Sequence, residues 1–429
     1  MAHLIVIADD LTGALDTGVQ FANSNVLIRV AAAAKVEDIP ADIFDCDIAV
    51  LDAELRHRTA QEAYRHCAAV VQAAVQRGAQ TIYLKTDSGL RGNIGAMFQA
   101  ALDSTGATFA AFAPALPRMG RVTCGGIAYI DGLPIDKSVF GQDPFEPVRS
   151  PYVKDLFTGC QAVVKNYPVG GGWDTQNLTK PTIGIFDAAC AEDFTAIANH
   201  LKQTGQLQIL GGCAGFAASL PPIFGLEGPP VRLPCVDAPL LVLCGSLNPI
   251  TKCQLEYGAK HGGIRISLQE EQLQPGYFDT PNGQAFLQKL TICMVSGRDI
   301  LMDTGGTEKA ESAGQADALR QVIAGQLGDL MCRLLAQAGS GSYLPMIIGG
   351  DTLMGFMQHL PQAEISPLGE AAPGAVLFSA VLPQNTRLII SKSGGFGSED
   401  LLANIHSNLQ KGINDEAISA CHAASGIQR

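Results

Sequence analysis

Positive charge is scarce in this sequence. Its 29 lysine and arginine residues are outnumbered by 41 aspartate and glutamate residues, which gives a formal net charge of −12 over 429 residues. Nucleic acids and anionic membrane surfaces both favour clustered positive charge. We therefore expect neither nucleic acid nor membrane to be a partner of this protein.

Long apolar runs and paired cysteines are also absent. No stretch approaches the roughly 20 apolar residues that cross a bilayer. The first apolar run, Leu4–Ala8, ends at two aspartates instead of continuing into a secretory signal. The 12 cysteines form no C-x-x-C pair, which argues against structural zinc and a disulfide framework. We expect a cytoplasmic protein with buried free thiols.

The first half of the chain alternates between short apolar segments and amphipathic ones. The segment Thr59–Gln76 has apolar residues at helical spacing, which predicts a helix with one buried face. Such alternation is typical of α/β proteins, whose parallel sheets are covered by helices on both faces. Strands are predicted at His3–Ala8, Leu27–Ala32, Ile48–Leu51, Thr81–Lys85 and Phe109–Pro114, and further helices at Thr12–Ala22 and Gly95–Leu102.

A second series of the same kind begins near residue 238. Six prolines in Leu220–Pro239 predict a connection without regular structure before it. We therefore predict two domains, residues 1–230 and 238–429, each a mostly parallel sheet flanked by helices. The strands predicted in the second domain are Leu240–Leu243, Ile264–Leu268, Ile300–Met302, Pro345–Ile348, Ala375–Val381 and Leu388–Ile390, with helices at Pro249–Lys260 and Ala316–Ala338.

Charged residues follow three predicted strands of the first domain. In parallel sheets, ligands collect at the carboxyl ends of strands. Asp9 and Asp10 follow the first strand, where they could cap the next helix, bind hydroxyl groups or accept a proton. The segment Lys85–Arg91 either forms a solvated turn or grips a carboxylate through its two cations, with Asp87 holding a hydroxyl. Arg56, after another strand, could add to that anion site.

Small residues follow three predicted strands of the second domain. They are Gly245-Ser246, Gly349-Gly350-Asp351-Thr352 and Ser393-Gly394-Gly395. Turns of small residues let backbone N–H groups approach a phosphate closely. Each turn alone is commonly structural, but three together favour a phosphate or nucleotide site.

Several well-known catalytic motifs are missing. There is no G-x-x-x-x-G-K-[ST], so the chain is not a P-loop NTPase, and no G-x-G-x-x-G follows the first strand. The eight histidines show no metal-ligand spacing. An NAD-dependent enzyme acting on a hydroxy acid stays open as an alternative, suggested by the α/β pattern alone.

Taken together, these strings resemble the four-carbon acid sugar kinase family, whose members phosphorylate threonate, erythronate or 3-oxo-tetronate with ATP. At one point the chain departs from the family, because Asn248-Pro249 replaces a serine-rich turn beside Ser246. The resemblance runs in order through Asp9–Gly13, Lys85–Ser88 with Arg91-Gly92, Pro114–Pro117 with Gly120-Arg121, Gly132–Pro134, Asp143-Pro144, Gly349–Thr352 and Ser391–Gly397.

This resemblance implies a sugar-acid-binding N-terminal domain, an ATP-binding C-terminal domain and an active site in the cleft between them. The implied substrate residues are Asp9, Arg56, Lys85, Thr86, Asp87, Ser88 and Arg91. The implied ATP residues are Ser246, Gly349, Gly350, Asp351, Thr352, Gly394 and Gly395. Asp351 is also expected to hold Mg²⁺. For catalysis we expect Asp87 or Asp10 to accept the hydroxyl proton, and Lys85 with Arg56 to hold the substrate carboxylate.

The expected activity is that of a phosphotransferase with an alcohol group as acceptor. D-Threonate or D-erythronate would be converted to the 4-phosphate, and a 3-oxo-tetronate 4-kinase is the alternative within the family. A regulator that binds nucleotide and sugar acid without turnover is the alternative outside it. Because two-fold dimers are the commonest soluble oligomers, we expect a homodimer.

Overall fold

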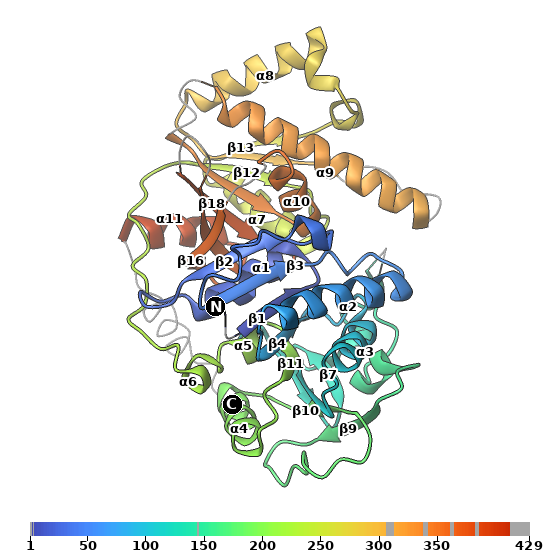
Figure 1. The fold of residues 1–429 in the computed structure, drawn as a ribbon. Coiled ribbons are helices and arrows are strands. Elements are labelled where there is room, and N and C mark those ends of the chain that lie inside the picture. The colour runs from blue at the N-terminus through green and yellow to red at the C-terminus, as the bar shows by residue number, and fades with distance from the viewer. Residues whose placement is uncertain are drawn as a thin grey trace. The chain divides into compact units, whose positions relative to one another are not determined.

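The computed structural model describes residues 2, 4–143, 146–305, 313–337, 342–360, 364–381 and 386–411, without the side chains of residues 313–317. The chain divides into two compact units, Met1–Pro229 and Pro230–Arg429. Each unit is an α/β structure built on its own run of mostly parallel strands (Figure 1). The predicted fold class is therefore confirmed.

The first unit contains eight parallel strands within its described residues. Strand β1 lies between β3 and β4, so strands far apart in sequence are neighbours in the sheet. In spatial order the strands are β2 (Ile28–Ala32), β3 (Ile48–Asp52), β1 (Leu4–Ala8), β4 (Thr81–Lys85), β11 (Ile209–Gly212), β5 (Phe109–Ala113), β10 (Thr182–Phe186) and β9 (Val163–Tyr167).

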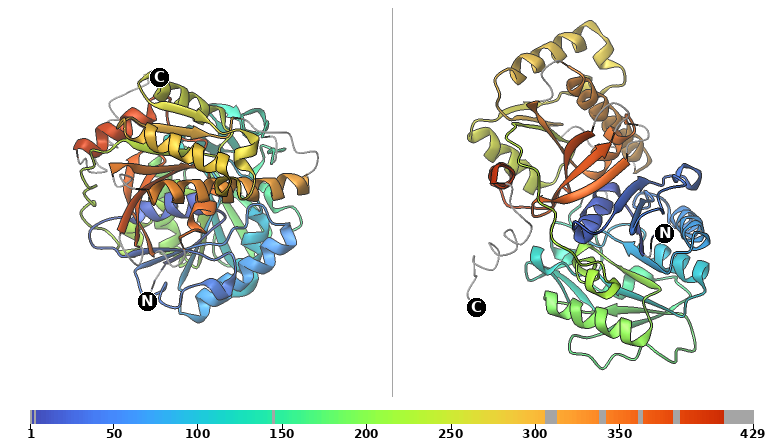
Figure 2. Two further views of the ribbon diagram at one scale, coloured as in Figure 1. Left: turned by 90° about the horizontal axis from the view of Figure 1, so that it is seen from above. Right: turned by 60° about the vertical axis from the view of Figure 1, so that its left-hand side comes forward.

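Helices α2 (Ala60–Gln76) and α3 (Ile94–Thr105) lie side by side and cover one face of this sheet (Figures 1 and 2). Helix α2 begins where the side chains of Thr59 and Glu62 bond each other's backbone N–H groups, a capping box. Its predicted apolar face is buried against the sheet, as the sequence spacing indicated. The remaining helices of the unit are α1 (Leu11–Gly18), α4 (Ala191–Thr204), α5 (Ala214–Ala217) and α6 (Pro221–Phe224).

The second unit has five parallel strands followed by two antiparallel ones among its described residues. Their spatial order is β13 (Ile264–Ser267), β14 (Ile300–Asp303), β12 (Leu240–Cys244), β15 (Leu344–Ile348), β18 (Thr386–Lys392), β17 (Ala375–Val381) and β16 (Glu364–Ala372). The helices are α7 (Pro249–Lys260), α8 (Pro281–Met294), α9 (Ala313–Leu335), α10 (Gly350–Met357) and α11 (Leu401–Lys411).

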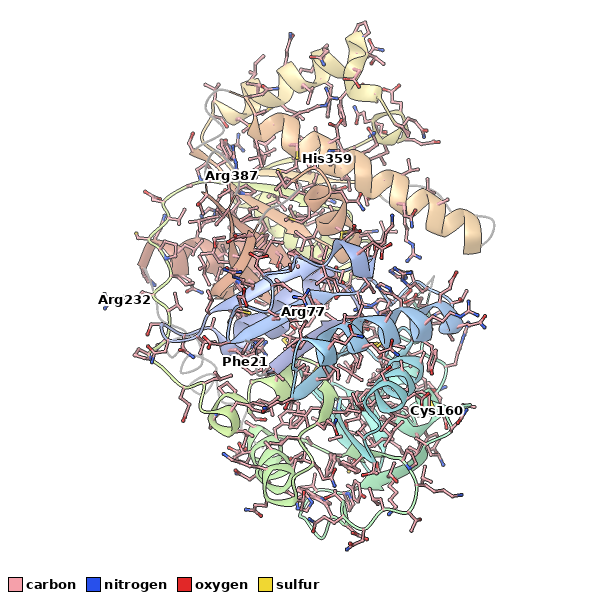
Figure 3. The ribbon with its side chains drawn as sticks, in the orientation of Figure 1. Phe21, Arg77, Cys160, Arg232, His359 and Arg387 are labelled. Atoms are coloured by element: carbon pink, nitrogen blue, oxygen red, sulfur yellow. The ribbon has the colours of Figure 1, made fainter. Side chains whose placement is uncertain are left out.

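Two side chains labelled in Figure 3 hold helix α9, one from the end of α10 and one from strand β18. His359 follows α10 and contacts the carbonyl oxygen of Gly325 on α9 at 3.2 Å from its Nε2 atom. Arg387 on β18 donates from Nη2 to the carbonyl oxygen of Leu335, the last residue of α9, at 3.1 Å. Helix α9 is thereby held at two points along its length.

Several predicted details were wrong. The helix expected at Thr12–Ala22 ends at Gly18 and continues as a 3₁₀ turn, because glycine is a poor helix former. The proline-rich connection contains the short helix α6, which starts at Pro221, a position where proline is tolerated. Buried thiols are found at Cys46, Cys67, Cys213 and Cys244, whereas Cys124, Cys190, Cys235 and Cys253 are exposed.

A small antiparallel sheet was missed altogether. It consists of β6 (Arg121–Cys124), β7 (Ile127–Ile130) and β8 (Leu133–Pro134). The first turn is Gly125-Gly126, with both residues at positive φ, as tight hairpin turns require. Strands of two to four residues are too short to show an alternating pattern, so the available signals were this glycine pair and Asp131-Gly132, the turn between β7 and β8, where both residues also have positive φ.

No helix in the described part of the chain is long and apolar enough to cross a membrane.

Candidate active site

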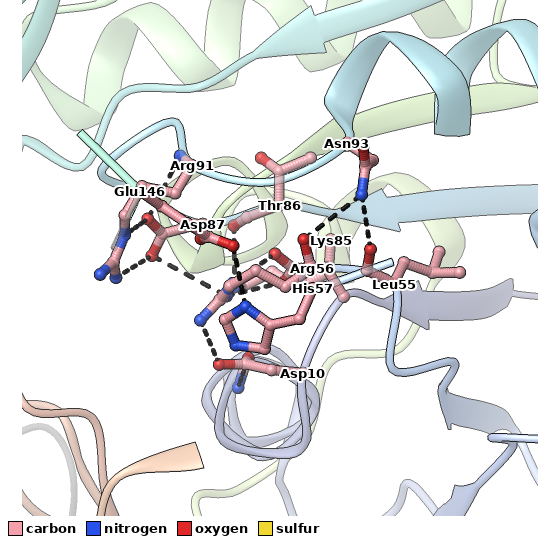
Figure 4. Close-up of polar contacts among 12 residues, drawn as sticks. Asp10, Leu55, Arg56, His57, Lys85, Thr86, Asp87, Arg91, Asn93 and Glu146 are labelled. Atoms are coloured by element: carbon pink, nitrogen blue, oxygen red, sulfur yellow. Dashed lines mark hydrogen bonds and ion pairs between the residues drawn. The ribbon is translucent and has the colours of Figure 1, made fainter. Parts of the chain in front are cut away.

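The carboxyl ends of three neighbouring strands form the centre of the candidate site in the first unit. Ala8 is in register with Asp52 of β3 and with Lys85 of β4. The segments that follow these residues therefore leave the sheet side by side. Because β1 lies between β3 and β4, Asp9 and Asp10 leave the sheet between the loop of Arg56 and the loop of Asp87. Figure 4 shows the side chain of Arg56 between those of Asp10 and Asp87.

Arg56 lies among three aspartates. It binds Asp9 through two hydrogen bonds, from Nε at 2.9 Å and from Nη2 at 3.0 Å. Its Nη1 lies 2.5 Å from Asp10 Oδ2, and its Nη2 lies 3.9 Å from Asp87 Oδ1 (Figure 4). In this structure Arg56 therefore neutralises the acidic residues of the site, and its predicted grip on a substrate carboxylate stays a prediction.

Asp10 has two structural roles besides its ion pair. Its Oδ1 accepts a hydrogen bond from the backbone N–H of Gly13 at 2.7 Å, so it caps α1. Its Oδ2 also accepts from the hydroxyl of Thr12 at 3.0 Å. The helix cap that the sequence allowed is therefore confirmed, and the roles of Asp10 in hydroxyl binding and proton acceptance stay predictions.

Asp87 is held by a second arginine. Arg91 donates from Nε at 2.7 Å and from Nη2 at 3.3 Å to the two oxygens of Asp87. The Nη1 atom of Arg91 binds Asp143 at 2.9 Å. The carboxylate of Asp87 is thus fixed in one orientation at the end of β4.

Burial and ion pairing act in opposite directions on the acidic groups. Burial raises the pKa of Asp87, but the guanidinium groups of Arg91 and Arg56 outweigh it and hold that pKa well below its usual range. Burial likewise opposes ionisation of Asp10, yet Arg56 and Lys85 lower its pKa. For Asp9 burial prevails over Arg56, and its pKa is raised. Asp87 and Asp10 are therefore carboxylates at neutral pH.

Lys85, Thr86 and Ser88 are buried beside these carboxylates. Lys85 Nζ donates to the carbonyl oxygen of Thr86 at 2.8 Å. A Cβ atom at Gly13 would lie 2.6 Å from that Nζ, so glycine lets α1 pass this close without a shift of the Lys85 side chain. The Thr86 hydroxyl is buried without a hydrogen-bond partner among the described residues, which leaves it able to bind a ligand hydroxyl.

Arg121 belongs to this cluster and was not among the predicted site residues. It lies on β6, donates from Nη1 to the hydroxyl of Ser88, and its guanidinium is 5.1 Å from the centre of the Phe140 ring. Arg91 lies over the same ring at 5.2 Å. Arg121 and Ser88 also line a small cavity. In the sequence, Arg121 appeared only as part of Gly120-Arg121, because strand β6, which carries Arg121, was not predicted.

Asn93 fixes the loop of Arg56, and it too was missed. Its Nδ2 atom lies 2.8 Å from the carbonyl oxygen of Leu55 and 3.3 Å from that of Arg56 (Figure 4). The same atom lies 2.7 Å from the carbonyl oxygen of Arg58. One side-chain amide thereby orders the backbone on both sides of Arg56. A single asparagine before a helix gives no such signal in the sequence.

We expect Asn93→Ala to lower the free energy of unfolding by about 1–3 kcal/mol, because three partly buried carbonyl groups lose their donor. Denaturant unfolding followed by circular dichroism measures this. Asn408→Ala is the matched control, because Asn408 Nδ2 binds a single carbonyl, that of Ala371, at 2.9 Å. Equal losses in the two variants would contradict the ordering role of Asn93.

The three small-residue turns of the second unit meet around Ser246. A Cβ atom at Gly394 would overlap Ser246 Oγ, and one at Gly349 would lie 3.6 Å from the backbone nitrogen of Ser246. A Cβ atom at Gly245 would overlap Thr352 Oγ1. The predicted residues Ser246, Gly349, Gly350, Asp351, Thr352, Gly394 and Gly395 are therefore brought to one edge of the second sheet.

The N-terminus of α10 opens at this edge. Its N-cap, Gly349, has φ +112° and no side chain to cap the helix. Helix N-termini attract anions because their first N–H groups lack partners within the helix. Asp351 lies exposed in the first turn. No group of three or more His, Cys, Asp or Glu side chains suited to a metal occurs in the part of the chain that is described.

Both units match known families. Residues 4–220 match a family described as a sugar-binding N-terminal domain, and residues 241–402 match one described as a nucleotide-binding C-terminal domain. The order of the two matches is that expected from the sequence.

Of three curated relatives, two are similar to this chain over nearly its full length and one over about half of it. D-threonate kinase of Salmonella typhimurium is 26% identical over 427 residues, which is 93% of this chain and 96% of that protein. D-erythronate kinase of Heliobacterium modesticaldum is 31% identical over 218 residues, 48% of this chain and 49% of that protein. 3-Oxo-tetronate kinase of Cupriavidus necator is 24% identical over 92% of this chain and 94% of that protein.

A solved structure of a Haemophilus influenzae protein has the same fold. It superposes with a TM-score of 0.66 and 18% identity, over 94% of this chain and 99% of that chain. The matched domains, the near full-length relatives and the motifs in the sequence agree. The chain belongs to the four-carbon acid sugar kinase family.

Proposed function

We propose that this protein transfers the γ-phosphoryl group of ATP to the terminal hydroxyl of a four-carbon sugar acid. D-Threonate is the first candidate, because relatives named for it match this chain over nearly their whole length. The observation that carries the proposal is the row of buried charged residues at the carboxyl edge of the first sheet, in a chain whose second unit matches a nucleotide-binding domain.

The chemistry of the first cluster suits a hydroxylated acid. Ionised carboxylates accept hydrogen bonds from hydroxyl groups, and Asp10 and Asp87 provide several such oxygens beside the carboxyl group of Asp9. Lys85 and Arg91 are cations that can bind the substrate carboxylate. Thr86 and Ser88 add hydroxyl groups between them. A four-carbon acid with hydroxyls at several positions would use both kinds of partner.

Asp87 or Asp10 would receive the proton of the attacking hydroxyl. Their lowered pKa values keep both groups ionised, so either can accept a hydrogen bond from the hydroxyl and orient it. A weak base suffices, because phosphoryl transfer passes through a loose transition state in which positioning and charge neutralisation dominate. Lys85 stabilises the same region by its positive charge.

The second unit would hold ATP at the turns around Ser246. Backbone N–H groups at the N-terminus of α10 and in the turn Gly394-Gly395 would bind phosphate oxygens. Mg²⁺ in nucleotide sites is commonly held by one or two carboxylates together with phosphates, and exposed Asp351 fits that arrangement. Bound Mg²⁺ neutralises phosphate charge.

The turnover test is ADP release with Mg²⁺-ATP over a panel of D- and L-threonate, D- and L-erythronate and their 3-oxo derivatives. Turnover of one member supports the proposal and identifies the acceptor, including the 3-oxo-tetronate alternative. No turnover, with ATP still raising the melting temperature, would favour a nucleotide-binding regulator or a different acceptor. No turnover and no stabilisation by ATP would contradict the proposal. The predicted homodimer is tested separately by sedimentation.

We expect Gly394→Ala to raise KM for ATP by at least tenfold while KM for the sugar acid changes little. The added methyl group would overlap Ser246 Oγ, which forces apart two turns that the nucleotide would contact. Gly325→Ala is the control, because a Cβ atom there meets nothing within 4 Å. Equal effects on both KM values in Gly394→Ala would argue against a nucleotide role for this turn.

A further inference from the structure

Three buried side chains, those of Thr251, Gln254 and Lys392, bind the carbonyl groups of the loop that follows β18. Lys392 Nζ lies 2.9 Å from the carbonyl oxygen of Ser393 and 3.3 Å from that of Gly394. Thr251 Oγ1 on α7 donates to the carbonyl oxygen of Gly394 at 2.7 Å. Two of these three side chains, Lys392 and Thr251, also contact each other at 3.3 Å.

Gln254, one turn further along α7, holds the second half of the same loop. Its Nε2 atom lies 2.9 Å, 3.0 Å and 2.9 Å from three carbonyl oxygens, those of Phe396, Gly397 and Ser398. Gln254 is fully buried. The loop therefore rests on Thr251, Gln254 and Lys392, which we call the loop clamp.

The clamp determines which way the loop's N–H groups point. In a trans peptide the carbonyl of one residue and the N–H of the next point in opposite directions. Because the carbonyl of Ser393 is turned toward Lys392, the N–H of Gly394 is turned away from the clamp. The Cα atom of Gly394 faces Ser246, because a Cβ atom added to Gly394 would overlap the hydroxyl of Ser246. The clamp thus presents backbone N–H groups at the turns assigned to the nucleotide.

Lys392 is an unusual member of this clamp. It is 1% exposed, and its hydrogen-bond partners in the described structure are a hydroxyl and two carbonyl oxygens, all of them neutral. Among the described residues no ion pair to Lys392 is found. The titratable group that faces it is the Cys244 thiol on β12, whose pKa is raised to about 11 by burial, so this thiol is neutral near pH 7. A buried charge without an opposite charge is costly, and burial lowers the pKa of Lys392 to about 7. An arriving polyphosphate would supply the opposite charge.

We propose that Thr251, Gln254 and Lys392 are positioning residues for nucleotide binding, and that the phosphates of the nucleotide provide the negative charge that stabilises protonated Lys392. This inference rests on the proposed function, because it takes the second unit to bind ATP. It adds residues on α7 and a buried cation to the glycine-rich turns.

The inference predicts that nucleotide binding takes up a proton. At pH 8 most of the free protein would carry neutral Lys392, and bound phosphates would favour its charged form. Calorimetric titration of the full chain with Mg²⁺-ADP in two buffers of different ionisation enthalpy measures this uptake. We expect up to one proton at pH 8 and an apparent Kd that rises by up to tenfold per pH unit above pH 7. The terminal phosphate of ADP is already ionised there and contributes no uptake.

Three variants separate this role from a structural one. Lys392→Met should remove the proton uptake and weaken Mg²⁺-ADP binding at least tenfold at pH 7. Lys392→Arg should also remove the uptake, because arginine stays charged, while binding ADP more tightly than Lys392→Met at pH 9. Gln254→Met should raise KM for ATP and leave KM for the sugar acid unchanged. Its control is Gln284→Met, since Gln284 Nε2 on α8 binds the carbonyl of Phe278 at 2.6 Å, away from the turns.

The outcomes distinguish this inference from the proposed function. No proton uptake by the wild-type protein at pH 8, or unchanged uptake in Lys392→Met, would overturn the role of Lys392 even where every variant folds. Uptake with ADP but no phosphorylation of any sugar acid would support the clamp and contradict the proposed acceptor. No binding of Mg²⁺-ADP by the wild-type protein would overturn both.

Discussion

Asp87→Asn is expected to lower kcat for the sugar acid by about 10²–10⁴-fold, the usual contribution of a positioned proton acceptor. The carboxylate of Asp87 is fixed by two hydrogen bonds from Arg91 and remains ionised because both neighbouring arginines lower its pKa. Asparagine keeps the shape but loses the charge. Steady-state kinetics at saturating substrate measure the loss.

Two companion variants make this result interpretable. Asp143→Asn removes the other carboxylate of Arg91, bound at 2.9 Å, and leaves Asp87 in place, so it should have a much smaller effect on kcat. Asp10→Asn removes the other candidate acceptor. If Asp87→Asn and Asp10→Asn both kept near wild-type kcat, neither aspartate would be the proton acceptor.

The second large effect is expected for Arg56→Met, on stability. Removing one partner of a buried ion pair typically costs about 3–5 kcal/mol, because the remaining charge has no compensation. Arg56 compensates Asp9 and Asp10 directly and lies 3.9 Å from Asp87. We therefore expect a loss of that size in the free energy of unfolding at pH 7, measured by urea denaturation.

The pH dependence of this loss identifies its cause. Asp10 and Asp87 have pKa values lowered in the folded state. Their ionisation therefore stabilises the wild-type fold above the unfolded pKa of about 3.9. That stabilisation disappears as the pH falls through the lower folded values. The difference between Arg56→Met and the wild type should thus be full at neutral pH and shrink in acid.

A surface pair provides the control for Arg56. Arg29 binds Asp42 at 3.1 Å, with 26% and 61% of the two side chains exposed. Exposed pairs contribute about 0–1 kcal/mol, so Arg29→Met should change stability by no more than that. A loss for Arg56→Met that is equally small, or that does not vary with pH, would contradict the compensation of buried aspartates.

The positions of the site residues could be predicted, but their pairings could not. Asp9, Arg56 and Asp87 each follow an apolar run, and the carboxyl ends of parallel strands share one edge of a sheet. That Arg56 binds aspartates depends on strand register and on which rotamer fits between them, and neither is encoded in local sequence pattern.

Residues whose contacts are with partners far away in the sequence were missed as well. Arg121 lies on a strand too short to show alternation, and Gln254 is an interior helical residue like many others. Asn93 precedes α3 as an ordinary polar residue but bonds carbonyls 35 to 38 positions away. Such contacts exist only once tertiary structure has formed.

The place of β11 in the first sheet affects how this protein is made. β11 is formed by residues 209–212 and lies between β4 and β5, pairing with both. Strand β5 ends at residue 113 and β11 ends at residue 212. The ribosome must therefore synthesise roughly a hundred further residues after β5 before β11 can pair with β4 and β5. During that interval the edge of β4 that carries Lys85 has no neighbour on one side. Strand β5 lacks both of its neighbours for part of this interval, because β10 and β11 come later in the chain. The nascent chain is therefore exposed to aggregation at β5 and at one edge of β4, the strand that carries Lys85, and chaperones acting during translation would protect it there.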